Sequence, residues 1–233
     1  MPNVLITGAS RGFGRELLKV YLKNEWTVFP LIRNFDTISE MVSFRSKQCY
    51  PILGDVTSDS IGLEIERTLS NATDSLDVLI NNAGNIKKNR GIENTSPDDL
   101  KDHFDVNCVG TFRCVKAVIP FLRKAQNPII INITSRWGSI GRTAAGKGEH
   151  IYGYNIAKAA QNMLTACLYQ DLKQYDINVF AIHPGKLLTS VAAPDADTLP
   201  EAAAQKLFDW INHVDKSFDC KCYDLMSETT MEW

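Results

Sequence analysis

The order of the segments along this chain limits its possible folds more than any other feature. Short apolar runs alternate with stretches in which apolar residues recur at helical spacing. This alternation favours parallel strands joined by crossover helices, because a parallel pair needs a long connection. Right-handed crossovers then place helices on both faces, so we expect an α/β, Rossmann-type, doubly wound parallel sheet. The expected strands are 4–7, 27–32, 48–53, 77–81, 128–134, 178–182 and a weaker 218–223, and the expected helices are 15–23, 61–69, 97–122 and 154–172.

Two local features bear on this expectation. Pro30 has no backbone N–H, yet it lies in a run that is typical of an inner strand. We therefore expect either a bulge there or a position at which the sheet does not need a backbone N–H donor. No linker rich in proline, glycine or serine divides the chain. We therefore expect one domain over residues 1–233, with a short substrate-binding segment around 186–200.

A glycine-rich turn follows the first expected strand and opens the first helix. Its spacing is Gly-x3-Gly-x-Gly. Glycine allows a tight turn and the close approach of a pyrophosphate, and the helix N-terminus presents free amides to an anion. A nucleoside triphosphatase loop would close with Gly-Lys-Ser or Gly-Lys-Thr, whereas Arg15 and Glu16 follow here. A turn without any ligand remains the alternative. The candidate dinucleotide-binding residues are Gly8, Ser10, Arg11, Gly12, Phe13 and Gly14.

The end of the second expected strand bears on the choice between NAD and NADP. An NAD site usually has an acid there to bind the ribose 2′-hydroxyl, but this strand ends in Ile32 followed by Arg33. An arginine suits the 2′-phosphate of NADP, and Arg11 is a second candidate. The alternatives are that both arginines are solvated, or that Asp36 serves NAD. Asp55 and Val56, after the third expected strand, are candidates for contact with the adenine.

Tyr154 and Lys158 share one face at the start of a long expected helix. A phenol beside an ammonium has a lowered pKa and can transfer a proton to or from a substrate oxygen. Tyr169 and Lys173 repeat the spacing, but no strand end precedes them, so we interpret that match as chance. Ser135 follows a strand end, where ligands bind in this architecture.

Asn107 falls inside an expected helix, where asparagine is disfavoured. We infer either a functional role or a local kink and polar contact at this position.

Composition excludes several other functions. The formal net charge is −2 and no long basic run exists, so we expect no nucleic-acid partner. No run approaches the about 20 apolar residues of a membrane span, and an apolar run beginning at Val4 leaves no room for a signal peptide, so we expect a cytoplasmic protein without a membrane partner. The cysteines and histidines do not cluster, so we expect no metal.

These motifs occur in the order found in the short-chain dehydrogenase/reductase family, which the chain resembles over most of its length. Within that family it is most similar to the sniffer and C-factor type of NADPH-dependent carbonyl reductase. The resemblance implies a seven-stranded parallel sheet and an NADP(H) cofactor. It further implies Tyr154 as acid/base, Lys158 as a ribose ligand that lowers the tyrosine pKa, Ser135 as the residue that orients the carbonyl, and Asn107 as the holder of a relay water. The remaining implied cofactor contacts are Asn82, Ala83, Gly84, Pro184, Gly185 and Thr189.

The expected activity is hydride transfer between NADP(H) and a carbonyl or alcohol of a small molecule. The alternatives are an NADP-binding regulatory or signalling protein without activity, and a biosynthetic dehydrogenase that runs in the oxidative direction. Trp137, Tyr152, Leu187 and Leu188 favour an apolar or aromatic substrate, and the short segment after Gly185 predicts an open site. The resemblance also implies a homodimer or homotetramer built through the helices around 100–123 and 154–173.

Overall fold

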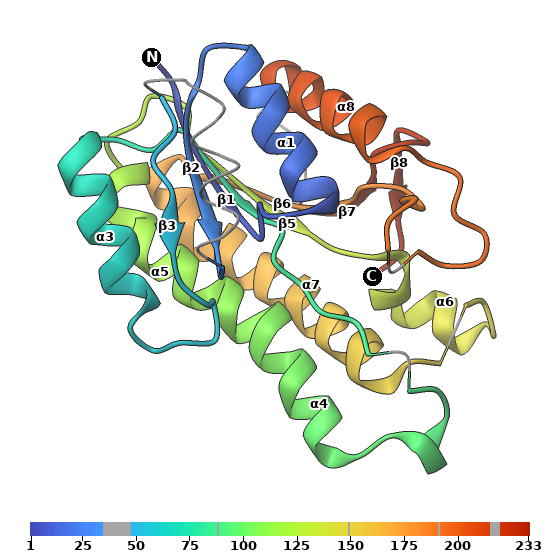
Figure 1. Ribbon diagram of the computed structural model, residues 1–233. Helices are drawn as coiled ribbons and strands as arrows, with labels where there is room; N and C mark the ends of the chain where they lie inside the picture. The colour runs from blue at the N-terminus through green and yellow to red at the C-terminus, as the bar shows by residue number, and fades with distance from the viewer. Residues whose placement is uncertain (35–47, 88, 149, 191, 215–219) are drawn as a thin grey trace.

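The computed structural model describes residues 1–34, 48–87, 89–148, 150–190, 192–214 and 220–233 (Figure 1). Within these ranges eight strands form one sheet in the order β3-β2-β1-β4-β5-β6-β7-β8. Every neighbouring pair is parallel except β7 with β8. The strands are β1 (Asn3–Thr7), β2 (Thr27–Ile32), β3 (Ile52–Leu53), β4 (Val78–Asn81), β5 (Ile129–Ile133), β6 (Asn178–His183), β7 (Cys222–Asp224) and β8 (Thr229–Met231).

The strand order confirms the doubly wound Rossmann-type fold. The chain passes from β1 outward to β2 and β3, then returns to build β4 to β7 on the other side of β1. The seven expected parallel strands are present as β1 to β7, and β8 adds an unexpected antiparallel strand at the edge. A tight turn is enough to join antiparallel neighbours, and three residues are too few to show a strand pattern in the sequence.

Side chains that alternate along the strands divide the interior into two apolar cores. Val4 and Ile6 point to one core, whereas Leu5 between them points to the other. Helices α1 and α8 cover the first face, and α3, α5 and α7 cover the second (Figure 1). The helices are α1 (Gly12–Lys23), α3 (Ile61–Ala72), α4 (Pro97–Phe104), α5 (Gly110–Leu122), α6 (Ile140–Ala144), α7 (Tyr152–Leu172) and α8 (Pro200–His213).

The helix expected over 97–122 is interrupted. It begins as the sequence indicates, because the Ser96 hydroxyl accepts the Asp99 amide and the Asp99 carboxylate accepts the Ser96 amide. The segment Asp105–Val109 then forms a π-helical turn between α4 and α5. The Asn107 side chain donates to the His103 carbonyl at 2.9 Å, and such local side-chain bonds compete with the helical pattern. Wide turns of this kind are frequent at functional sites.

Pro30 lies within β2 opposite Ile6 of β1, without a bulge in that ladder. The ladder between β2 and β3 is the one affected, because it is broken between the bridge at Cys49 and the pair Leu31–Ile52. The strand expected over 48–53 is therefore reduced to Ile52–Leu53. The missing amide is accommodated by omitting one ladder bond near the edge of the sheet.

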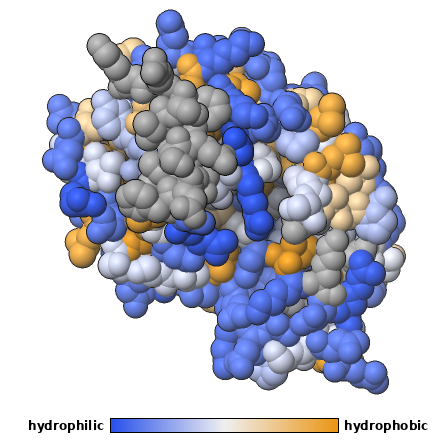
Figure 2. Space-filling view, in the orientation of Figure 1, coloured by the Kyte–Doolittle hydropathy of each residue, from blue (hydrophilic) through white to orange (hydrophobic). Residues whose placement is uncertain are grey.

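The outer surface carries mainly polar side chains in the view of Figure 2, where hydrophobic residues form small separate groups. Within the described ranges, no helix combines the length and the apolar character that a bilayer-spanning helix requires. The weak strand expected over 218–223 is found as β7 (Cys222–Asp224), and residues 218 and 219 lie outside the described ranges.

Candidate active site

The carboxyl ends of β1, β4, β5 and β6 border a cavity of about 690 Å³. We call it the central cavity. Every residue that the sequence analysis named as a catalytic or cofactor-binding candidate lines it. From the glycine-rich turn and the second and third strand ends these are Gly8, Ser10, Arg11, Gly12, Phe13, Gly14, Arg33, Asp55 and Val56, and from the later segments Asn82, Ala83, Gly84, Asn107, Ser135, Tyr154, Lys158, Pro184, Gly185 and Thr189.

The turn between β1 and α1 is held against the end of β4 by side-chain hydrogen bonds. The Thr7 hydroxyl accepts the backbone amides of Asn82 at 3.0 Å and Ala83 at 2.9 Å. The Asn82 side-chain amide donates to the Thr7 and Gly8 carbonyls at 2.9 and 3.1 Å. Gly8 has φ +68° and a Cβ there would stand 2.8 Å from the Ala83 Cα, so only glycine fits this position. Asn82 is thus a support for the turn as well as part of the cavity wall.

Gly14 lies where the helix passes closest to this turn. A Cβ on Gly14 would stand 2.4 Å from the Gly8 carbonyl oxygen and 2.5 Å from the Asn82 side-chain nitrogen. Gly14→Ala is expected to displace the turn, weaken nicotinamide-cofactor binding by at least about tenfold and lower the melting temperature, because backbone atoms have no easy way to retreat. Fluorescence titration with NADPH and thermal unfolding measure the two effects.

Gly62→Ala is the matched control, because a Cβ at that α3 position would meet only the Ala117 Cβ, at 3.7 Å. A helical glycine-to-alanine change should leave cofactor binding unchanged and stabilise the fold by about 0.5–1 kcal/mol. Equal cofactor affinity in the Gly14 and Gly62 variants would contradict the role given to the turn.

The N-terminus of α1 is suited to an anion. Its described first turn contains no acid, and no side chain caps its amides. Those amides therefore face the cavity with the partial positive charge of the helix end. With Gly8 and Gly12 both at positive φ, this backbone forms a cradle that a Cβ would fill, and it fits the pyrophosphate of a dinucleotide.

The region beside the end of β2 is positively charged but open. The Arg33 side chain is 71% exposed, and its guanidinium lies 3.5 Å from the Asp55 carboxylate. Partial burial raises the pKa of Asp55, but hydrogen bonds from Thr57 and the charge of Arg33 outweigh this and lower it overall. Asp36, the alternative partner for an NAD ribose, lies outside the described residues.

Tyr154 lies in the first turn of α7, against Ser135 at the end of β5. The indole of Trp137 meets the tyrosine ring edge-on at 6.0 Å and limits its movement. Burial raises the pKa of Tyr154, and a hydrogen bond with Ser135 only partly opposes this. The phenol is therefore protonated at neutral pH, which is the form that can donate a proton.

Lys158 is 4% exposed, one turn further along α7. Its ammonium donates to the Ile133 carbonyl at 2.7 Å and to the Gln161 side-chain oxygen at 3.0 Å. Burial lowers the pKa of Lys158 to about 7. The sequence expectation that this lysine lowers the tyrosine pKa stays a prediction, because the causes that set the pKa of Tyr154 here are burial and the Ser135 hydrogen bond. The ammonium is 5.8 Å from the centre of the Tyr154 ring, and burial dominates both groups.

Gln161 is a residue that the sequence analysis missed. It is fully buried, and its side-chain amide donates to the Thr111 hydroxyl at 3.0 Å. Thr111 in turn donates to the Asn107 carbonyl at 2.9 Å, so a chain of side-chain bonds runs from Lys158 to the π-helical turn. The signal in the sequence was a polar residue three positions after Lys158, on the same side of the helix.

Asn107 has one polar atom free for a ligand or water. Its side-chain nitrogen donates to the Asn85 side chain at 2.8 Å, but its Oδ1 is buried and has no hydrogen-bond partner. A Cβ on Gly84 would stand 3.0 Å from this oxygen, so Gly84 keeps the space open. Buried acceptors are normally satisfied, and a water is the simplest partner.

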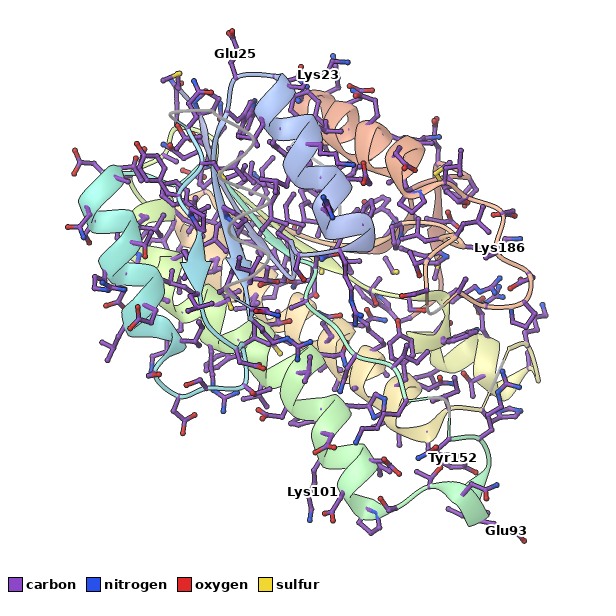
Figure 3. All side chains as sticks on the ribbon, viewed as in Figure 1. Lys23, Glu25, Glu93, Lys101, Tyr152 and Lys186 are labelled. Carbon is purple, nitrogen blue, oxygen red and sulfur yellow. The ribbon has the colours of Figure 1, made fainter. Side chains whose placement is uncertain are left out.

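The other side of the cavity is formed by the segment after β6. Leu187 and Leu188 line it, as does His183, which the sequence analysis missed although it directly precedes Pro184. Trp137 is buried against Tyr154 and does not line the central cavity. Tyr152, at the start of α7, is 37% exposed and lines neither this cavity nor the neighbouring one lined by Lys186 (Figure 3).

A doubly wound sheet, a glycine-rich turn at a helix N-terminus and a tyrosine–lysine pair beside it are the features of a dinucleotide-dependent oxidoreductase. The sequence model described as short chain dehydrogenase matches residues 2–199. The chain therefore belongs to the short-chain dehydrogenase family, and it is an NAD(P)-dependent oxidoreductase.

Similar proteins agree with the subgroup that the sequence resembles. The carbonyl reductase Sniffer of D. melanogaster superimposes with a TM-score of 0.90 at 25% identity, covering 100% of both chains. The C-signal protein of Myxococcus xanthus is 34% identical over 128 residues, which are 55% of this chain and 75% of that protein. The NADPH-dependent pterin aldehyde reductase of Arabidopsis thaliana is 30% identical over 211 residues, which are 87% of this chain and 84% of that protein.

Proposed function

We propose that this protein is an NADPH-dependent carbonyl reductase that acts on small molecules. The observation that carries the proposal is the arrangement of Tyr154, Ser135 and Lys158 in the same cavity as the glycine-rich turn. A reductase needs a proton donor next to the place where a carbonyl oxygen binds, and Tyr154 and Ser135 supply such a pair.

Each group then has a distinct task. The amides of the α1 N-terminus hold the cofactor pyrophosphate, and Asp55 with Val56 contact the adenine. The bound nicotinamide supplies the hydride. Ser135 donates a hydrogen bond to the carbonyl oxygen and stabilises the charge that develops there. Tyr154 transfers its phenolic proton to that oxygen, which is possible at neutral pH because burial keeps the phenol protonated.

Lys158 and the groups behind it complete the site. Lys158 binds the nicotinamide ribose, and its position is set by the Ile133 carbonyl and by Gln161. The free Oδ1 of Asn107 holds a water through which the proton on Tyr154 is replaced. Asn82, Ala83 and Gly84 form the wall of the cofactor groove. The proposed contacts on the nicotinamide side are Pro184, Gly185 and Thr189.

Several observations support NADP over NAD. Arg11 and Arg33 both line the central cavity, and no acid occupies the described end of β2. The Arabidopsis relative is by its name NADPH-dependent. Turnover of aldehydes, aromatic ketones, diketones and quinones with NADPH, and little with NADH, is the expected result. NADPH binding without any turnover would instead favour the regulatory alternative. The similarity to the C-signal protein is the reason for considering that alternative.

Arg33→Ala and Arg11→Ala test the cofactor assignment. Each is expected to reduce kcat/KM for NADPH by about 10- to 100-fold and to leave kcat/KM for NADH within about twofold, because a charged hydrogen bond to phosphate is worth about 1.5–3 kcal/mol. Steady-state kinetics with both cofactors measures the ratio. Arg67→Ala is the control, since Arg67 pairs with Glu64 on α3, away from the cavity. An unchanged ratio in both test variants would remove the arginines from the assignment.

A homo-oligomer is part of the same proposal. Phe112 on α5 is 47% exposed, and Ile156 and Met163 on α7 are 47% and 67% exposed. Large apolar side chains that gather on neighbouring helices are often covered by a second copy of the chain. Sedimentation velocity measures the state directly. The oxidative direction is the second candidate for the reaction, and the relative rates with NADPH and NADP⁺ distinguish it.

A further inference from the structure

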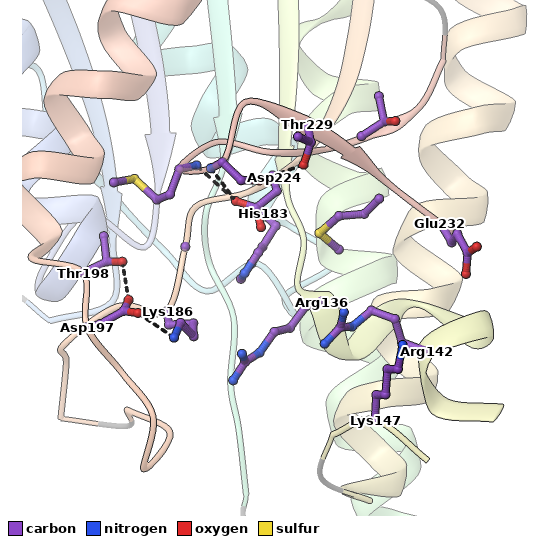
Figure 4. Close-up of a pocket in the computed structure, with 15 residues that line it drawn as sticks. Arg136, Arg142, Lys147, His183, Lys186, Asp197, Thr198, Asp224, Thr229 and Glu232 are labelled. Atoms are coloured by element: carbon purple, nitrogen blue, oxygen red, sulfur yellow. Dashed lines mark hydrogen bonds and ion pairs between the residues drawn. The ribbon is translucent and has the colours of Figure 1, made fainter. Parts of the chain in front are cut away.

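A second cavity of about 710 Å³ adjoins the central cavity at the carboxyl ends of β5, β6 and β7. His183 and Gly185 line both cavities, so the two are neighbours across the end of β6. Cationic side chains from segments after β5 and β6 line this second space, and Figure 4 shows how they lie. We call it the basic cavity, and its cations are Arg136, Arg142, Lys147 and Lys186.

Two of these cations are already neutralised. Arg136 donates to both oxygens of Asp195, at 2.7 and 2.8 Å. The Lys186 ammonium lies 2.5 Å from the Asp197 carboxylate, as the dashed line in Figure 4 indicates. Such pairs hold the rim of the cavity in place, and they leave little charge for a ligand.

The other two cations, Arg142 and Lys147, have no ion-pair partner among the described residues. The Arg142 Nε is buried without a hydrogen-bond partner. A buried guanidinium N–H without an acceptor is unfavourable, and guanidinium geometry matches a carboxylate or a phosphate. These two side chains are therefore the part of the basic cavity that is prepared for an anion.

The floor of the basic cavity supplies a second, independent observation. His183 is 6% exposed, and its Nδ1 has no hydrogen-bond partner although the ring reaches the cavity (Figure 4). Burial lowers the pKa of His183 to about 4, Asp224 opposes this, and Arg136 and Arg142 add to it. At neutral pH the ring is thus uncharged, and it can offer a hydrogen bond without adding to the local charge.

Besides Asp197, which pairs with Lys186, two further acids line the basic cavity and act against an anion. Asp224 is occupied, because its carboxylate accepts the backbone amides of Met226 and Ser227 at 3.1 and 3.3 Å. Glu232 has no ion-pair partner within the described ranges, and it lies against Gly141. Glu232 should therefore weaken anion binding, which supplies a variant of opposite sign.

We propose that the basic cavity binds a carboxylate or phosphate group of the substrate, held by Arg142 and Lys147 with His183 beneath it, while the carbonyl lies at Tyr154 in the central cavity. This inference rests on the proposed reductase function and names its substrate class: flexible carbonyl compounds with an anionic far end. It changes the expectation of a wholly apolar substrate, because Leu187 and Leu188 would contact only the middle of such a molecule.

The test compares ω-oxo acids with their methyl esters, using chains of four, six and eight carbons. Each pair has the same reacting aldehyde and differs in the charge at the far end. We expect kcat/KM for the acid to exceed that for the ester by at least tenfold at one chain length, and ω-phosphorylated aldehydes of that length distinguish phosphate from carboxylate as the preferred anion. A ratio near one at all lengths would overturn the inference while the proposed function stands.

Three variants locate the anion. The double variant Arg142→Gln, Lys147→Gln is expected to lower the acid-to-ester ratio about tenfold, and Glu232→Gln is expected to raise it. Lys124→Gln is the matched control, because Lys124 is an exposed lysine after α5 that lines neither cavity, and its ratio should equal that of the wild type. A ratio that does not move in opposite directions in the first two variants would place the anion elsewhere.

Failure of the proposed function has a different signature. If neither acid nor ester is reduced, calorimetric binding of the corresponding ω-hydroxy acids and ω-hydroxy esters in the presence of NADP⁺ still decides the matter. Tighter binding of the acid, lost in the double variant, would support the basic cavity without the reductase assignment. Equal affinities of acid and ester would refute the inference.

Discussion

Tyr154→Phe is expected to reduce kcat by about 10³-fold while the dissociation constant for NADPH changes less than about threefold. The change removes only the phenolic oxygen, which is the proposed proton donor, and a positioned general acid typically contributes 10²–10⁴-fold. Phenylalanine retains the ring that packs edge-on against Trp137, so the fold and the cofactor groove should be preserved. Turnover of the best aldehyde from the panel and fluorescence titration with NADPH measure the two quantities.

The control for this variant is a second tyrosine substitution in the same helix. Tyr169→Phe removes a phenol from the second Tyr-x3-Lys match, which the structure places toward the end of α7, against the core and away from the central cavity. Its kcat should stay within about twofold of the wild type. Undiminished turnover in Tyr154→Phe would remove the assigned acid, and equal losses in both variants would indicate damage to α7 in place of lost chemistry.

Lys158→Met is expected to lower kcat/KM by at least about 10²-fold and also to stabilise the fold without cofactor at neutral pH. The activity falls because the proposed ribose ligand and neighbour of Tyr154 is removed. Stability rises because burial lowers the pKa of Lys158 from 10.5 to about 7, so folding penalises its charged form. Methionine has a similar shape without the charge. We expect a gain on the order of 1–2 kcal/mol at pH 7, after allowance for the hydrogen bonds lost at Ile133 and Gln161.

The same pKa shift predicts how stability depends on pH. Between about pH 7 and pH 10.5 the unfolded chain binds more protons at this lysine than the folded chain, so this group makes the wild type more stable as pH rises through that window. Below pH 7 the penalty is present in full. The free energy of unfolding of Lys158→Met should therefore exceed that of the wild type by the largest amount at or below pH 7, and this excess should shrink toward pH 10.

Denaturant unfolding at pH 7 and pH 10 measures how the difference in unfolding free energy between the variant and the wild type decreases. Lys173→Met, at the lysine of the second Tyr-x3-Lys match, is the control and should show no such dependence. A constant difference between Lys158→Met and the wild type across the two pH values would show that Lys158 is not destabilised by burial.

Most of the central cavity could be predicted because its chemistry is local in the sequence. Gly8, Gly12 and Gly14 lie within one turn, and Tyr154 and Lys158 lie one helical turn apart, so their spacing already shows that they act together. The strand ends were equally visible, because parallel strands are buried on both faces and appear as continuous apolar runs. The order of these runs then implied that the conserved geometry of such a sheet would bring their carboxyl ends to one edge.

The parts that sequence analysis missed depend on contacts between distant segments. The hydrogen bond from Gln161 to Thr111 joins residues of two helices that are 50 positions apart in the sequence, and nothing in either segment indicates that the two residues pair. The wide turn at Asn107 and the added strand β8 are similar cases, since each depends on a competing hydrogen bond or a new edge pairing. Interactions of this kind are chosen by packing and are only weakly encoded by local propensity.

The sequence by itself determined the fold class, the family resemblance and the nominated site residues, because periodicity and short motifs are properties of neighbouring residues. Only the tertiary structure decided the electrostatics. It placed Tyr154 and Lys158 in an environment that raises one pKa and lowers the other, and it left His183 and Arg142 with unpaired atoms beside the basic cavity. The physical reason is that desolvation and unsatisfied polar groups depend on which atoms surround a residue, and those atoms come from strands and loops that meet only when the chain has folded.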